Sequence, residues 1–122
     1  MLNFYNLYLF FICQVISYCH RFNQKEKASS LLLIASSLTF KDILPFIKAF
    51  YYNQLAINQR FKGEIAECKV SMEKSIALVD IAEPRARVLW QNYMTNVAFN
   101  GELKDNEVYQ LKKLEGLSPQ GF

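Results

Sequence analysis

A short motif recurs along this chain at a nearly constant interval. It reads RFNQ at 21–24, RFKG at 60–63 and AFNG at 98–101, so its copies follow one another at offsets of 39 and then 38. A period of this length is typical of helical repeat proteins, in which one unit cannot bury its apolar face alone and stacks on its neighbours. We therefore expect helix pairs with these motifs at their turns. In this register Ser29 matches Cys68.

Apolar residues recur every three or four positions along most of the chain, which indicates amphipathic helices. The breaks contain helix signals, because Pro45 and Pro84 suit a first turn and Asn100-Gly101 ends a helix. The predicted fold class is all-α, a right-handed solenoid of about three antiparallel helix pairs. The expected helices cover 4–21, 26–39, 46–61, 64–80, 85–99 and 103–114, which form the pairs 4–39, 46–80 and 85–114 of one repeat domain (1–115) before a flexible C-terminal tail (116–122).

The composition agrees with one folded domain. Of the 122 residues 52% are hydrophobic and 20% are charged, which suffices for a core and is too apolar for a disordered chain. The net charge of +3 is too small to indicate direct binding of nucleic acid. The cysteines, Cys13, Cys19 and Cys68, are odd in number and lack the spacing of a disulfide framework, so we expect buried free thiols and a cytoplasmic location.

The sequence offers little for catalysis. His20 is the single histidine, and neither an acid partner, a nucleophile elbow nor a phosphate-binding glycine loop accompanies it. Cys13 and Cys19 lie close to His20 in sequence, but free cysteines in apolar helices are more often core residues than metal ligands. We predict that the chain is not an enzyme and holds neither a metal nor a cofactor.

The uncharged N-terminal segment leaves two interpretations open. Residues 1–20 carry no formal charge and include the apolar run LYLFFIC at 7–13, so a small protein anchored in a membrane through residues 2–19 is one alternative. The other is a helix of a soluble domain, packed on one side and lining a polar groove. We favour the second because polar residues form one stripe of the helix: Asn3, Asn6, Gln14 and Ser17.

The middle copy resembles the tetratricopeptide repeat, which places an aromatic residue early in its first helix, small residues where its helices cross and a glycine in the turn. The matching residues are Tyr52, Leu55, Ala56, Gly63, Cys68, Met72, Ser75 and Leu78.

Within that superfamily, Phe46–Leu78 and the following Pro84–Met94 resemble the C-terminal region of Rgg/GadR/MutR-type transcriptional regulators of Gram-positive bacteria. An apolar-aromatic helix, a single glycine turn and a helix with a central methionine recur there in this order. The resemblance implies a quorum-sensing domain that binds a short, pheromone-like peptide and signals to a DNA-binding domain. Those regulators begin with a helix-turn-helix domain, so we expect a truncated or split form that does not contact nucleic acid directly.

A peptide site follows from the repeat register. If the first helices of the pairs line one concave surface, then Gln14, Asn53 and Gln91 occupy equivalent positions on it. Carboxamides can bridge the N–H and C=O groups of an extended peptide, and arginine can clamp a carboxylate. The predicted peptide-binding residues are Gln14, Tyr18, Arg21, Asn53, Ile57, Arg60, Gln91 and Thr95.

A different class of function is equally open to test. The chain is expected to be a homodimer, and it could be a general protein–protein interaction or dimerisation module without a ligand groove. Its first helix is too apolar for one short domain to bury, which favours a partner subunit. The aromatic residues expected at such an interface are Phe4, Phe10, Phe11, Phe50 and Tyr51.

Overall fold

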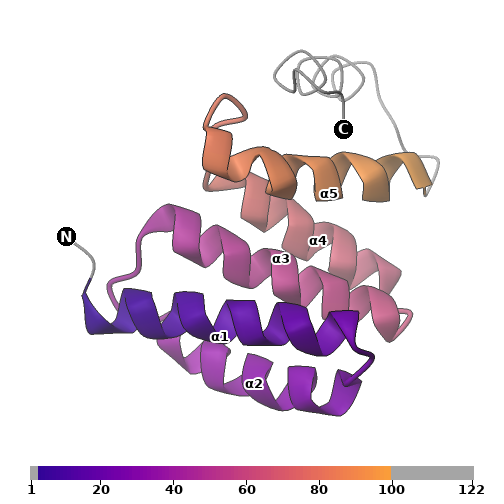
Figure 1. Ribbon diagram of the computed structural model, residues 1–122. Helices are drawn as coiled ribbons and strands as arrows, with labels where there is room; N and C mark the ends of the chain where they lie inside the picture. Colours follow the sequence, from indigo (N-terminus) through magenta and orange to yellow (C-terminus); the bar gives the residue numbers. More distant parts are fainter. Residues whose placement is uncertain (1–2, 100–122) are drawn as a thin grey trace.

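The computed structural model describes residues 3–99, and all regular secondary structure in this range is helical, which confirms the predicted all-α class. The expected helix at 103–114 and the tail at 116–122 lie outside the described residues. The described elements are α1 (Phe4–Arg21), α2 (Lys25–Leu38), α3 (Pro45–Phe61), α4 (Ile65–Ala77), a short 3-10 helix η1 (Pro84–Ala86) and α5 (Arg87–Phe99) (Figure 1).

The described helices form two hairpins and one further helix, α5, with α3 at the centre. α1 and α2 form the first hairpin, α3 and α4 form the second, and α3 contacts every other α-helix of the described part. Figure 1 shows α1 beside α3, with α2 below α1 and α5 above α4. One cluster of buried side chains joins α1, α2 and α3, and another joins α3, α4 and α5. The first includes Leu9, Ile16, Leu32 and Ile47, and the second includes Ala56, Cys68, Met72 and Tyr93.

The two hairpins turn in the same way. Asn23 and Gly63 both have a positive φ, of 58° and 78°, and each lies two residues after the last residue of its helix, α1 or α3. The next N–H group in each turn donates a hydrogen bond back into the helix, from Gln24 to the Cys19 carbonyl and from Glu64 to the Gln59 carbonyl. This is the Schellman arrangement, in which a left-handed residue ends the helix. Asn23 and Gly63 are therefore the equivalent positions, and the offset between the two hairpins is 40.

This offset corrects the register predicted from the sequence. Ala28, and not Ser29, is the counterpart of Cys68, and both are fully buried. The order of buried, partly buried and exposed residues along 21–40 is repeated at almost every position along 61–80. The predicted offset of 39 was wrong by one because it matched the letters of the Arg-Phe dipeptides rather than the two left-handed turn residues.

Polar side chains at the start of α1 fix the connection between the hairpins. Asn3 caps α1, since its Oδ1 accepts from the backbone N–H of Asn6 at 2.9 Å. The buried Asn6 accepts from the N–H of Leu44 at 2.7 Å and donates to the Asp42 carbonyl at 3.3 Å. The expectation that Asn6 lines a polar groove was therefore wrong, because its carboxamide is enclosed and holds the segment that leads into α3.

Candidate functional site

The predicted row of carboxamides is not aligned as the sequence suggested. Asn53 is only 4% exposed, and its Oδ1 accepts a 3.0 Å hydrogen bond from Nδ2 of Asn92 in α5. The expectation that Asn53 is partly exposed and free to bind a peptide backbone was wrong. Gln14 is exposed and Gln91 is partly exposed. The physical reason is the register, because the offset of 40 pairs Asn53 with the buried Cys13.

The remaining predicted residues lie mostly at the surface. Arg21, Arg60 and Thr95 are exposed, and Ile57 is partly buried. Tyr18 is exposed, and the guanidinium carbon of Arg21 lies 5.5 Å from the centre of its ring. Gln14, Tyr18 and Arg21 thus share α1, whereas their predicted pairing with Asn53, Ile57 and Arg60 of α3 does not hold.

At the offset of 40, one stripe of residues on α1 is exposed, whereas the equivalent stripe on α3 is covered by the first hairpin. On α3, Ile47 and Tyr51 belong to the buried cluster shared with the first hairpin. Asn58 in the same stripe contacts His20 and Ser29 of that hairpin at 3.3 Å each. The α3 stripe is therefore the surface by which the second hairpin packs on the first. Its buried members are Ile47, Tyr51, Gln54 and Asn58, and their exposed counterparts in α1 are Leu7, Phe11, Gln14 and Tyr18.

Three further aromatic residues of this surface flank the α1 stripe. Phe4, Tyr8 and Phe22 are exposed, and the Tyr18 and Phe22 rings stack with their centres 6.1 Å apart. The expected exposure of Phe4 and Phe11 is thereby confirmed, while Tyr51 is buried, contrary to the prediction. We call the following seven residues the open face of α1: Phe4, Leu7, Tyr8, Phe11, Gln14, Tyr18 and Phe22.

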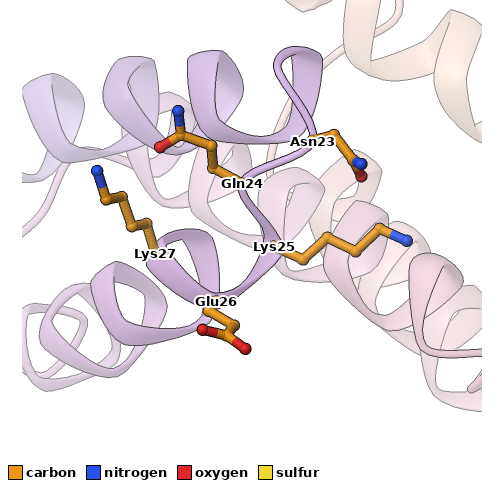
Figure 2. A pocket seen from close by; sticks show the side chains of 5 residues that line it. All are labelled: Asn23, Gln24, Lys25, Glu26 and Lys27. Atoms are coloured by element: carbon orange, nitrogen blue, oxygen red, sulfur yellow. The ribbon is translucent and has the colours of Figure 1, made fainter.

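A wide concavity at the turn of the first hairpin does not have the arrangement of side chains that a binding site needs. It has a volume of about 520 Å³ and is lined by the consecutive residues 23–27. Figure 2 shows that these side chains spread outward from the turn in different directions and do not converge on a common point. A ligand site needs convergent polar groups on an apolar floor. The concavity is therefore better understood as the solvated outside of a turn.

His20 and the three cysteines lie in or beside the core. Nε2 of His20 lies 3.3 Å from Oδ1 of Asn58, and its ring packs 5.4 Å from that of Phe61. Cys13, Cys19 and Cys68 are free and buried as predicted, and burial raises the pKa of the Cys13 thiol to about 12. Such a thiol is not a nucleophile at neutral pH. Among the described residues we find neither a group of side chains able to hold a metal ion nor a helix long and apolar enough to cross a membrane.

Comparison of the chain with protein-family models, with curated protein sequences and with solved structures returned no match. The resemblance to Rgg-type regulators therefore stays a prediction from the sequence. What the geometry supplies is a helical scaffold with one aromatic, uncharged surface on α1, and the open face of α1 is the strongest candidate site in the described part of the chain.

Proposed function

We propose that this chain is a protein–protein interaction module, built as a short tetratricopeptide-like array, and that the open face of α1 receives a helical partner. One observation carries the proposal. The four positions of α3 equivalent to Leu7, Phe11, Gln14 and Tyr18 are buried, and they pack on the first hairpin, while Leu7, Phe11 and Tyr18 on α1 are between 54% and 65% exposed. The same positions of the repeat thus bind helices in one place and face solvent in the other.

The chemistry of the open face supports a partner. The open face presents phenylalanine and tyrosine, aromatic residues that are enriched in the cores of protein interfaces. The Tyr18 and Phe22 rings of this surface already stack on each other without a partner. Preorganised aromatic side chains lose little conformational entropy when they become buried.

A peptide-sensing role in transcription regulation is the second candidate. It is favoured by the position of Gln14, Tyr18 and Arg21, which belong to the predicted peptide site and remain exposed along one helix. Gln14 could hydrogen-bond a peptide backbone and Arg21 could pair with a carboxylate. Asn53, the central carboxamide of the predicted row, is buried and bonded to Asn92, however, so it cannot hold an extended peptide. We therefore rank this role below the binding of a folded helix.

Site-specific photo-cross-linking in the cells that express the chain tests the interaction module. A benzophenone side chain is placed at Phe11, on the open face, and at Val70, which is 52% exposed on α4. We expect cross-links to a polypeptide from position 11 and not from position 70. The identified partner is then purified, and Leu7→Glu should weaken its binding at least tenfold while Val70→Glu leaves it unchanged. Equal cross-linking at both positions, or cross-links to lipid alone, would contradict the proposal.

A further inference from the structure

The size of the open face suggests what covers it. At roughly 200 Å² for a fully exposed aromatic or large aliphatic side chain, the exposed fractions of its six apolar members correspond to about 700 Å². The largest apolar patch on a typical monomer is about 300–600 Å². A stable interface of standard size buries about 800 Å² on each partner. The open face is thus larger than an ordinary surface patch and close to one half of a standard interface.

The charge of α1 does not oppose a partner with the same surface. Arg21, at the C-terminal end, is the single formally charged side chain of this helix when His20 is neutral. Two copies can therefore approach through their open faces without burying like charges. In an antiparallel contact, Arg21 of each copy reaches the end of the other copy where α1 begins. Asp42 and Lys41 both lie at that end, because the Asp42 carbonyl accepts a 3.1 Å hydrogen bond from Asn3 and Nζ of Lys41 lies 5.0 Å from the centre of the Tyr5 ring. Their opposite charges balance, so Arg21 meets no net like charge there.

We propose that the open face of α1 binds a second copy of this chain, with the two α1 helices packed antiparallel about a two-fold axis. The inference rests on the proposed interaction module and names its partner. An antiparallel pairing centred between Phe11 and Gln14 brings the stripe into register with itself. Leu7 faces the partner's Tyr18, Phe11 faces the partner's Gln14, and Phe4 faces the partner's Arg21. Such an isologous contact uses the same patch on both subunits, which closes the assembly at two copies.

The spacing of exposed residues along α1 suits this arrangement. The following positions alternate steps of three and four residues, the pattern by which two long helices pack along a shared seam: Phe4, Leu7, Phe11, Gln14, Tyr18 and Arg21. All six are exposed. The alternation covers the full length of α1, which is 18 residues or about 27 Å at 1.5 Å per residue.

Sedimentation equilibrium of the purified 122-residue chain tests the stoichiometry. We expect the mass of a dimer at micromolar concentration and at least a tenfold increase in the dissociation constant for Leu7→Glu. Val70→Glu is the matched control, since Val70 and Leu7 are 52% and 54% exposed and both lie in α-helices. Circular dichroism verifies that both variants keep their helices. A wild-type chain that stays monomeric up to 100 µM, or a dimer that Leu7→Glu does not weaken, overturns the inference.

Cysteine cross-linking tests the orientation of the helices. In the antiparallel register the two copies of residue 7 lie about 16 Å apart, at 1.5 Å per residue, so Leu7→Cys alone should form no intermolecular disulfide. The double variant Leu7→Cys/Tyr18→Cys should give a covalent dimer on mild oxidation, and wild type, whose cysteines are buried, should not. A covalent dimer of Leu7→Cys alone overturns the antiparallel arrangement. If the chain is monomeric while position 11 cross-links a different protein, the interaction module stands and self-association fails.

Discussion

Replacement of Asn6 by alanine should destabilise the fold by about 2 kcal/mol, because it removes buried hydrogen bonds. The buried carboxamide makes three side-chain hydrogen bonds: Nδ2 to Oδ1 of Asn3 at 2.9 Å, Nδ2 to the Asp42 carbonyl at 3.3 Å, and Oδ1 from the N–H of Leu44 at 2.7 Å. A net contribution of about 1 kcal/mol for each well-formed bond gives about 2–3 kcal/mol, with the 3.3 Å contact counted as weak. The better helix propensity of alanine offsets about 0.6 kcal/mol of this.

The measurement is urea unfolding followed by circular dichroism at 222 nm, with the free energy of unfolding taken from the linear extrapolation. Protein concentration is kept equal for all variants, because self-association would make the apparent stability depend on it. Ser30→Ala, at an exposed position of α2, is the control and should change the free energy of unfolding by less than about 0.5 kcal/mol. If Asn6→Ala is as stable as this control, the carboxamide does not hold the hairpin connection and the argument is refuted.

Three further predictions concern the turn, the centre of α3 and the core thiol. Gly63→Ala should cost about 1 kcal/mol in urea unfolding because φ is positive there, although a Cβ would meet nothing within 4 Å, whereas Gly63→Asn should cost less since Asn23 adopts the same conformation. Asn53→Ala should lower stability by about 1–3 kcal/mol by removing the bond to Asn92, and an unchanged urea midpoint would contradict its structural role. Burial raises the pKa of Cys13 from 9.0 to about 12, so its stabilising contribution is complete below pH 9 and is lost as pH rises toward 12. Unfolding free energies at pH 8 and pH 10 should differ by less in Cys13→Ala than in wild type, by about 1 kcal/mol.

The positions of the helices could be predicted from the sequence because local signals determine them. The helix expected at 4–21 is found at Phe4–Arg21, and that expected at 46–61 begins one residue earlier, at Pro45. Proline at a first turn and a strict apolar period are visible in the letters alone. The start of α5 was predicted less accurately, because Pro84–Ala86 forms a separate 3-10 turn before Arg87. That turn is stabilised by Glu83, whose carboxylate accepts from the backbone and side chain of Arg85.

The register of the repeat, and with it the site, could not be read from residue types. The two Arg-Phe dipeptides begin at positions 21 and 60, but the residues that adopt the left-handed conformation are Asn23 and Gly63, one position further apart. Asparagine adopts a positive φ more often than most residues but far less regularly than glycine, so the sequence alone does not show that Asn23 is equivalent to Gly63. A shift of one residue rotates a helical position by about 100°, given 3.6 residues per turn. This error of one residue in the predicted register explains why Asn53 was expected on the ligand surface but lies in the interior.

Equivalent exposed positions of the two hairpins hold different types of residue, and this difference separates what folding requires from what an interface requires. Exposed outer positions of the first hairpin hold Leu33, Ile34 and Phe40, whereas the equivalent positions of the second hairpin, which are also exposed, hold Glu73, Lys74 and Asp80. Since both hairpins pack in the same way, folding does not demand apolar residues at these places. On the open face of α1, Leu7 and Phe11 are apolar like their buried counterparts in α3, Ile47 and Tyr51, but no helix of the described part covers them. The apolar surface of the first hairpin is therefore not a requirement of packing within the described part, which is the reason for proposing a partner for α1.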